Sequence, residues 1–230
     1  MNAPYILALD SASEKCSVAI AKGAQCLYEI VEHTPSMASE RLVSMTQECL
    51  AKSGVSLNQM NYLVATKGPG SFTGLRINLS IAQGFLIALK NLTPIAFDSF
   101  AYYHYRAQKQ VESFDYNIVL LDAYRAGAYV SVKNSTSSDV LPASILNEQE
   151  LCVLLENIPA NNIILISGNC VHKFYVHIKH LANLIILPRY NYTRAKILCQ
   201  MALVAINSNS FDTSLAPYYI APVNAKIPLK

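Results

Sequence analysis

The sequence predicts an α/β protein in which one structural plan occurs twice along the chain. Two openings carry this prediction: ILALDSAS at residues 6–13 and IVLLDAYR at residues 118–125 each place an aspartate at the end of a short apolar run. Apolar runs of this length, bounded by turn residues, are typical of buried strands. Each opening is followed by further short apolar runs and by segments with helical periodicity. We therefore interpret the chain as two similar units.

The first copy begins with three strands and continues with two helix–strand pairs. A helix from Ser36 to Lys52 is predicted by apolar residues at helical spacing, and Gly54 is its expected stop. A second helix is expected from Thr73 to Lys90. The predicted strands are 5–9, 16–21, 26–32, 62–66 and 94–97.

The second copy repeats the plan with a shorter hairpin and less regular spacing. Its helix at Asn147–Asn157 starts with a capping-box pattern, because Glu150 follows Asn147 by three residues. The other expected helices are 171–181 and 192–206, and the expected strands are 117–121, 128–132, 140–142, 163–167 and 184–187. The stretch from Asn207 to Lys230 is rich in Asn, Ser and Pro and is expected to be irregular.

Three strands, a helix, a strand, a helix and a strand, with an acid after the first strand, form the order typical of a ribonuclease-H-like unit. Two such units in one chain are typical of the actin-like ATPase (ASKHA) fold. The expected fold class is therefore α/β, with two ribonuclease-H-like halves and mixed sheets. We place the halves at residues 1–105 and 106–230, because polar and aromatic residues replace the periodic pattern at residues 102–114.

The composition indicates that part of the surface of the chain is buried against another molecule. Of 230 residues, 52% are hydrophobic and only 14% are charged, against about a quarter in ordinary domains. A partner chain or a membrane would provide such a cover. The first apolar run, Tyr5–Leu9, is too short to span a bilayer and lacks a basic leader. We therefore expect a cytoplasmic protein without membrane contact, with its six cysteines reduced and buried.

The most distinctive stretch is KGPGSFTGLRI, Lys67–Ile77, in which three glycines and a proline fall within seven residues between a strand and a helix. Ser71 or Thr73 can cap the helix, and a helix N-terminus favours an anion. One interpretation is therefore a phosphate cradle. The other is a rigid strand-to-helix turn in which Gly74 permits close packing. A Walker loop is excluded, because the GK[ST] ending is absent.

The helix that follows this stretch is apolar on nearly every face. Its apolar residues are Leu75, Ile77, Leu79, Ile81, Ala82, Phe85, Leu86, Ile87 and Leu89. A helix of this kind must be covered on all sides. One face is expected to meet the sheet, and the other needs the helix at 36–52 or a partner chain.

Taken together, GPGSFTGLRI, LALDSAS and LLDAYRAGAYV resemble the TsaB family. The resemblance is strong over residues 5–132 and weak beyond them, although YYIAP at residues 218–222 is similar to the closing motif of the family. The motif residues are Gly68, Pro69, Gly70, Ser71, Phe72, Thr73, Gly74 and Arg76. The resemblance implies an actin-like fold and participation in forming threonylcarbamoyladenosine in tRNA, as the non-catalytic paralogue of the transferase TsaD.

The resemblance also implies partners. TsaB-like chains bind TsaD through their two N-terminal helices and support assembly with a small ATPase, TsaE. By position, these helices correspond to residues 36–52 and 73–90. A homodimer is expected to form through the same two helices. Contact with tRNA is expected only within the complex. The predicted contact residues are Leu42, Met45, Cys49, Leu75, Leu79, Ala82, Phe85 and Leu86.

The metal chemistry of the catalytic paralogue is missing from this sequence. That paralogue holds its metal with an HxxxH pair on its first helix, whereas the corresponding SMASERLVSMTQECL contains no histidine. His177 and His180 could share a helix face, but the sequence places no further ligand beside them. A solvated basic helix is the favoured interpretation of that segment. We therefore expect no metal, no cofactor and no catalytic residue.

Two aspartates keep an enzymatic alternative open. Acids at the positions of Asp10 and Asp122 organise Mg²⁺ and phosphates in actin-like ATPases, so Asp10, Ser11 and Asp122 are possible nucleotide-facing residues. With the Gly68–Gly74 turn they would make an ATPase or phosphotransferase. In the favoured interpretation, Asp10 caps its turn through Ser11 and Ser13, and Asp122 supports the turn that follows it.

Binding of tRNA by the isolated chain is a third alternative and is not favoured. The net charge is only +3, and the basic residues are scattered apart from a loose group at Arg189, Arg194 and Lys196. Nucleic-acid binding normally requires Lys and Arg clustered on one face.

Overall fold

The structure is a computed structural model. It describes residues 3–13, 15–33, 41–187 and 192–220. Its internal contacts divide the chain into two units, which are described separately. The first unit comprises Met1–Tyr102 and Tyr192–Tyr218, and the second comprises Tyr103–Asn191 and Tyr219–Lys230.

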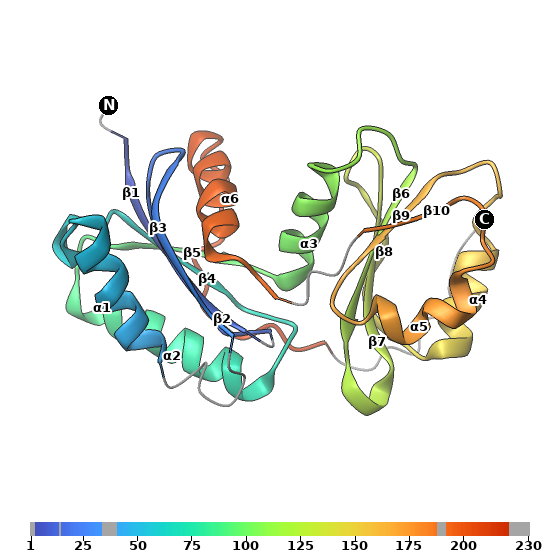
Figure 1. Cartoon of the computed structure of the whole chain (residues 1–230), viewed down its shortest axis with the longest axis horizontal. Coiled ribbons are helices and arrows are strands. Elements are labelled where there is room, and N and C mark those ends of the chain that lie inside the picture. The colour runs from blue at the N-terminus through green and yellow to red at the C-terminus, as the bar shows by residue number, and fades with distance from the viewer. Residues whose placement is uncertain (1–2, 14, 34–40, 188–191, 221–230) are drawn as a thin grey trace. The chain divides into compact units, whose positions relative to one another are not determined.

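The first unit contains a five-stranded mixed sheet in the order β3-β2-β1-β4-β5 (Figure 1). Its strands are β1 (Tyr5–Asp10), β2 (Cys16–Lys22), β3 (Gln25–Glu32), β4 (Tyr62–Thr66) and β5 (Thr93–Phe97). The central strand β1 is antiparallel to β2 and parallel to β4. Both of its faces are buried from Ile6 to Asp10. This explains why the strand is continuously apolar instead of alternating.

Helices cover both faces of this sheet. They are α1 (Leu42–Ser53), α2 (Phe72–Ala88) and α6 (Ala195–Asn207), and a short 3-10 turn lies at Leu57–Gln59. Figure 1 shows α1 and α2 on one face and α6 on the other. Leu7 and Leu9 of β1 pack in one core with residues of α1 and α2. Because side chains alternate along a strand, Ile6 and Ala8 point to the opposite face, where α6 contacts β1 and β2.

The two helices that the sequence predicts in this unit are present. The predicted helix 36–52 corresponds to α1, which ends at Gly54 in a left-handed C-cap with φ 67°. Its predicted first residues, 36–40, lie outside the described residues. The predicted helix 73–90 corresponds to α2, which starts one residue earlier and ends at Ala88.

The second unit repeats the sheet with β6 in the place of β1. Its strand order is β10-β9-β6-β7-β8, and β6 is antiparallel to β7 and parallel to β9. The strands are β6 (Tyr116–Asp122), β7 (Ala128–Asn134), β8 (Asp139–Leu146), β9 (Ile164–Ser167) and β10 (Leu184–Ile186). The helices are α4 (Glu148–Glu156) and α5 (Val171–Ile178), with a 3-10 turn at Tyr124–Ala126. The repeat confirms the predicted class: two ribonuclease-H-like halves of an actin-like α/β fold.

The predicted capping box at the start of α4 is also present. Asn147 N donates to Glu150 Oε2 at 2.8 Å, and Glu150 N donates to Asn147 Oδ1 at 3.0 Å. The reciprocal pair satisfies two backbone N–H groups at the helix start.

One helix in the structure has no counterpart in the sequence prediction. The helix α3 (Ser99–Gln108) lies where the prediction places the start of a boundary region without periodic structure. Its start is capped by Asp98, whose Oδ1 accepts a hydrogen bond from Ala101 N at 2.7 Å. The segment is rich in tyrosine and polar residues, so its apolar periodicity is weak and the helix was not recognisable by that criterion.

The division of the chain differs from the predicted halves 1–105 and 106–230 by three residues at the boundary and by one longer segment. Residues Tyr192–Tyr218, which include α6, belong to the first unit. Ser17 on β2 holds the start of α6, because its Oγ donates to Thr193 O at 2.9 Å and accepts from Ala195 N at 3.0 Å. The apolar face of α6 completes the second layer of the first sheet, which is why this late segment returns to it.

The segment that follows α6 is irregular, yet it is tied to the first sheet. Ala96 N on the edge strand β5 donates to Asp212 O at 2.8 Å, and Tyr218 N donates to Lys67 O at 2.7 Å. The side chains of Lys67 and Asp212 form an ion pair. The tail therefore covers part of the β5 edge and fixes the residue that starts the KGPGSFTGLRI motif.

Membrane insertion of a helix finds no support in the described part of the chain. None of the helices there combines the length and the apolarity that crossing a membrane requires.

Candidate functional site

The motif loop, Lys67–Ser71, connects β4 to α2 and is held by the turn that follows β1. Ser71 is the N-cap of α2, and its Oγ accepts a hydrogen bond from Gly74 N at 3.2 Å. Ser71 N donates to Ala12 O at 2.8 Å. Gly68 adopts φ 106°, a backbone conformation that favours glycine. Of the two predicted caps, Ser71 and Thr73, the structure selects Ser71.

Two glycines of the motif let its backbone approach the β1–β2 turn closely. A Cβ on Gly70 would lie 2.3 Å from Ala12 O, and a Cβ on Gly74 would lie 1.9 Å from Ser11 O. The Ser11 hydroxyl also donates to Gly74 O at 2.8 Å. The start of α2 is thus packed directly against the backbone of the β1–β2 turn. This geometry supports the interpretation of the motif as a rigid strand-to-helix turn.

Asp10 is fully buried at the end of β1. Its carboxylate accepts hydrogen bonds from the Thr66 hydroxyl, from Ala12 N at 3.4 Å and from the Ser13 hydroxyl at 3.3 Å. Burial raises the pKa of Asp10 to about 6, and these hydrogen bonds partly oppose the rise. The contacts support the turn-capping interpretation for Ser13, whereas Ser11 is directed to the start of α2.

A buried asparagine extends this arrangement into α2. Asn78 Nδ2 donates to Thr66 O at 3.0 Å and lies 3.4 Å from Thr66 Oγ1. Asp10, Thr66 and Asn78 are each 0% exposed. We call these three residues the Asp10 network. It links the ends of β1 and β4 to α2, so it fixes the position of that helix on the sheet.

Asp122, at the end of β6 in the second unit, supports the turn that follows it. Its Oδ1 accepts from Tyr124 N at 2.8 Å, and its Oδ2 lies 2.6 Å from Lys173 Nζ. The hydrogen bond that Lys173 donates to Asp122 raises the pKa of Lys173. Each of the two predicted aspartates is thus engaged in local contacts of its own unit.

Most of the predicted partner-contact residues lie inside the first unit. Leu42, Met45, Cys49, Leu75, Leu79 and Ala82 are each at most 3% exposed. Phe85 and Leu86 are partly buried against the same core. The prediction that these residues contact a partner directly is therefore corrected for the six that are at most 3% exposed. Their helical spacing marks the side of each helix that packs on the sheet.

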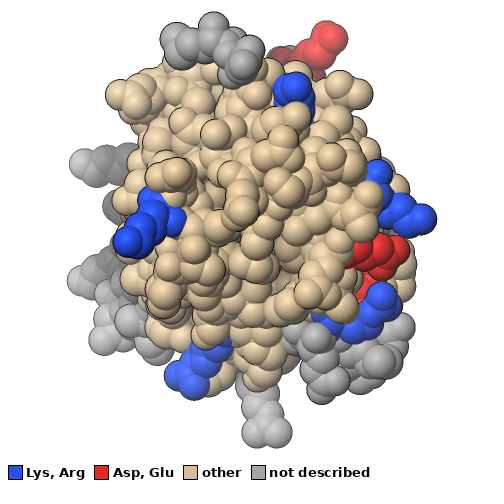
Figure 2. Space-filling view, turned by 90° about the vertical axis from the view of Figure 1, so that its left-hand side faces the viewer, with Lys and Arg blue, Asp and Glu red and all other residues tan. Residues whose placement is uncertain are grey.

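The opposite sides of the two helices form what we call the outward face. It consists of Val43 and Gln47 on α1 and of Phe72, Thr73, Arg76, Ser80, Gly84 and Ile87 on α2. Ile87 is 82% exposed and Val43 is 44% exposed. The Arg76 guanidinium lies 3.8 Å from the centre of the Phe72 ring. Figure 2 views this side of the molecule: charged side chains lie towards its rim and leave a broad uncharged area at its centre.

Sequence reasoning missed most of the outward face. The signal was present in the small and polar residues Ser80, Gln83 and Gly84, which recur among apolar ones on α2. In a helix packed on a sheet, such positions mark the solvent side. The sequence predicts a role for Phe72, Thr73 and Arg76 only as residues of the motif.

Of the two histidines that could share a helix face, His177 lies on α5 and His180 lies beyond its end. His177 Nε2 lies 2.7 Å from Glu148 Oε1 on α4, and His180 is exposed. Within the described ranges, no three His, Cys, Asp or Glu side chains are placed to hold a metal ion. Arg189, from the loose basic group, lies outside these ranges, while Arg194 pairs with Glu29 in the first unit.

Parts of the chain are similar to known proteins. A family model described as "TsaD: tRNA N6-adenosine threonylcarbamoyltransferase" matches residues 32–136. The tRNA threonylcarbamoyladenosine biosynthesis protein TsaB of Haemophilus influenzae is 40% identical over 98 residues, covering 40% of this chain and 41% of that protein. TsaB of Escherichia coli is 43% identical over 82 residues, covering 36% of this chain and 35% of that protein. The matches thus span about two fifths or less of these relatives.

The fold is similar to that of a solved structure over nearly the whole chain. The protein "YeaZ from Pseudomonas aeruginosa" superimposes with a TM-score of 0.76, covering 94% of this chain and 100% of that one. The two sequences are 21% identical, so this likeness concerns the fold alone.

Proposed function

Because the chain belongs to the TsaB family, we propose that it is a non-catalytic subunit in the formation of threonylcarbamoyladenosine in tRNA. In this proposal it binds a TsaD-like catalytic paralogue through the outward face. The observation that carries the proposal is the outward face itself. It exposes Ile87, Val43 and Phe72 on α1 and α2, whose opposite sides pack in the core of the first unit. Exposed apolar surface of this kind marks sites of protein association.

The composition of the outward face suits the packing of a partner helix. Ser80 and Gly84 are small and lie one turn apart, so another helix can approach α2 closely. A Cβ built on Gly84 meets nothing within 4 Å. Ile87 supplies an apolar contact at one end, and Arg76 supplies a charged contact near the other. The small residues therefore lie at the middle of the helix, with larger contact side chains on either side of them.

The buried side of the helices contributes indirectly. The motif loop, the Gly74 approach and the Asp10 network fix the start of α2 against the sheet. A rigid surface loses less conformational entropy on binding than a mobile one. The motif residues therefore act in this proposal as positioning residues for the outward face.

Three features of the chain support the non-catalytic part of the proposal. The segment that would carry the HxxxH pair has no histidine. Asp10 is fully buried, and its carboxylate accepts hydrogen bonds from neighbouring residues. Asp122 forms an ion pair with Lys173. The ATPase alternative gains no support from these contacts. Assembly with a TsaE-like ATPase and self-association are further parts of the proposal. If both partners use the outward face, homodimer and heterodimer exclude each other.

We expect Gly84→Arg to weaken binding to the TsaD-like paralogue at least tenfold while the chain stays folded. The new side chain enters open space, but it fills the surface that a partner helix would occupy. A tenfold loss corresponds to about 1.4 kcal/mol. Binding is measured by isothermal titration of the purified paralogue, and folding is followed by circular dichroism.

The matched control is Val204→Arg on α6, the helix on the other face of the same sheet, where Val204 is 57% exposed. This variant is expected to bind like the wild type. Equal binding of the wild type and of the Gly84 variant would disprove the proposed interface. Absence of any complex with the wild type would disprove the partnership itself.

A further inference from the structure

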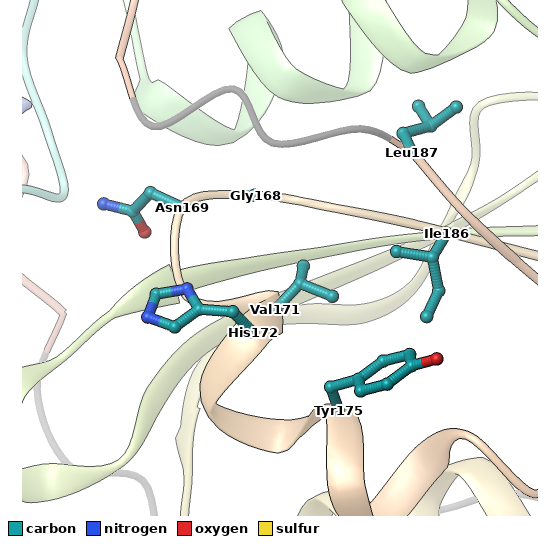
Figure 3. A pocket seen from close by; sticks show the side chains of 7 residues that line it. All are labelled: Gly168, Asn169, Val171, His172, Tyr175, Ile186 and Leu187. Carbon is teal, nitrogen blue, oxygen red and sulfur yellow. The ribbon is translucent and has the colours of Figure 1, made fainter.

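A concave pocket and a projecting pair of side chains suit different kinds of partner. A pocket of about 280 Å³ lies in the second unit between the turn Gly168–Asn169, α5 and the end of β10 (Figure 3). A hollow of this kind takes a small molecule. On the outward face of the first unit, Phe72 and Arg76 lie instead on the exposed side of α2. Exposed aromatic and arginine side chains of this kind are typical of surfaces that bind another protein.

Arg76 differs from the other arginines of the first unit in having no acidic partner among the described residues. The other two, Arg41 and Arg194, form ion pairs with Glu32 and Glu29. Arg76 makes no such pair with any described Asp or Glu, and α2 itself contains neither residue type. A guanidinium keeps its charge at every physiological pH. The charge of Arg76 is therefore available to an anion outside the described residues.

The Phe72 ring holds the Arg76 guanidinium in place. Arg76 follows Phe72 by four residues on α2, a spacing at which side chains meet on one helix face. Its Cζ lies 3.8 Å from the centre of the ring. Stacking of this kind covers one flat side of the guanidinium and leaves the N–H groups at its edge for hydrogen bonds. A side chain that is held before binding loses less conformational entropy when it binds.

The small residues of α2 bring a partner helix within reach of Arg76. Ser80 follows Arg76 by four residues, which is about 6 Å along the helix axis, and Gly84 follows Ser80 by the same interval. Arg76, Ser80 and Gly84 thus form one row on the outward face. A helix that packs across Ser80 and Gly84 passes beside the guanidinium, so one of its side chains can meet Arg76.

We propose that Arg76 binds a carboxylate of the TsaD-like paralogue, on the helix that packs across Ser80 and Gly84. The planar guanidinium matches the two oxygens of an Asp or Glu side chain and forms two parallel hydrogen bonds with them. This inference rests on the proposed function and names the chemistry that Arg76 selects in the partner. Arg76 is thus a specificity-determining residue, because a partner without the acid would leave a guanidinium unpaired in the interface.

The surroundings of Arg76 favour a carboxylate of a protein over a phosphate of tRNA. The other residues of the outward face, as defined above, are all uncharged. Binding of a nucleic-acid strand normally requires several Lys or Arg side chains clustered on one face. A single fixed guanidinium among apolar and small residues suits one ion pair at a protein interface, where arginine is enriched.

The test is a series of substitutions at Arg76, with binding to the purified paralogue measured in the absence of RNA. Arg76→Gln is expected to weaken binding about thirtyfold, which corresponds to about 2 kcal/mol, mainly through faster dissociation. Arg76→Lys keeps the charge but loses the planar fork, so its affinity is expected to lie between those of the wild type and Arg76→Gln. Arg76→Glu is expected to bind most weakly, because two carboxylates then face each other.

Association and dissociation rates are measured by surface plasmon resonance at low and at high salt. The loss caused by Arg76→Gln is expected to be smaller at high salt, where ion pairs are screened. The matched control is Lys22→Gln, which removes one charge from another cation–aromatic contact of the first unit. Lys22 Nζ lies 5.0 Å from the centre of the Tyr5 ring, on strands and not on α1 or α2. This variant is expected to bind like the wild type, and circular dichroism checks the folding of each variant.

An affinity order of wild type, Arg76→Lys, Arg76→Gln and Arg76→Glu, from tightest to weakest, supports the proposal. Equal binding of the wild type and Arg76→Gln overturns it, and so does equal weakening by Arg76→Gln and Arg76→Glu. An effect that appears only when tRNA is present would assign Arg76 to a phosphate and also overturns it. If Gly84→Arg weakens binding while the Arg76 variants do not, this inference fails and the proposed interface stands. If the wild type forms no complex, both fail.

Discussion

Replacing Gly74 with alanine is expected to destabilise the first unit by about 3 kcal/mol, the upper end of the usual cost of overpacking a well-packed site. The added Cβ would lie 1.9 Å from Ser11 O, which is backbone and cannot rotate away. The start of α2 and the β1–β2 turn must therefore separate. This separation also breaks the hydrogen bond from the Ser11 hydroxyl to Gly74 O. The loss is measured as a lower midpoint in urea unfolding followed by circular dichroism.

The same helix provides the matched control. Gly84 lies ten residues along α2, meets nothing within 4 Å of its Cβ position and has no positive φ. Gly84→Ala is therefore expected to stabilise the chain by up to about 1 kcal/mol through helix propensity. If the two substitutions change the unfolding midpoint alike, the close approach at Gly74 does not determine the position of α2.

Asp10→Asn is expected to remove a pH dependence of stability worth about 3 kcal/mol between pH 4 and pH 7. Burial raises the pKa of Asp10 from its usual 3.8 to about 6. Between these values the folded chain binds a proton that the unfolded chain has released. The wild type therefore loses stability as the pH rises through this window. Asparagine has the same size and does not titrate, so the variant lacks this loss.

The measurement is the difference in unfolding free energy between the wild type and Asp10→Asn at several pH values. A difference is required because His104 in the second unit titrates in the opposite sense. Burial lowers the pKa of His104 to about 4, so its contribution is lost as the pH falls from 6.5 towards 4. That contribution is common to both proteins and cancels. A difference that is constant from pH 4 to pH 7 would contradict the assigned pKa of Asp10.

Much of the fold was predictable because the strands and helices of the first unit carry clear local signals. The run Tyr5–Leu9 is apolar throughout since β1 is buried on both faces, and Gly54 ends α1 where glycine is expected. The helix α3 was not predictable from periodicity, since tyrosines and polar residues make up most of it. The return of α6 to the first sheet was not predictable either. It depends on contacts such as Ser17 with Thr193, which are far apart in sequence and carry no local pattern.

The candidate site was predicted at the level of the helices and not of their faces. The prediction that Leu42, Met45 and Leu79 contact a partner depends on their apolar character, but the same character places them in the core. The outward face contains residues such as Gly84 and Ser80, which single-residue hydrophobicity does not select. The pocket beside Asn169 left no signal, because its residues come from the β9–α5 turn, α5 and the end of β10. Only the folded sheet brings them together.

The discontinuity of the first unit has a consequence for how the protein is made. Its five strands are synthesised first, but the helix α6 and the tail at Asp212 and Tyr218 emerge only after the strands of the second unit. Until then Ile6 and Ala8 lack the layer that covers them, and the β5 edge is open. At a translation rate of about 5–20 residues per second, the roughly 100 residues between β5 and α6 prolong this exposure by about 5 to 20 seconds. The nascent N-terminal half is therefore expected to expose apolar surface until α6 emerges.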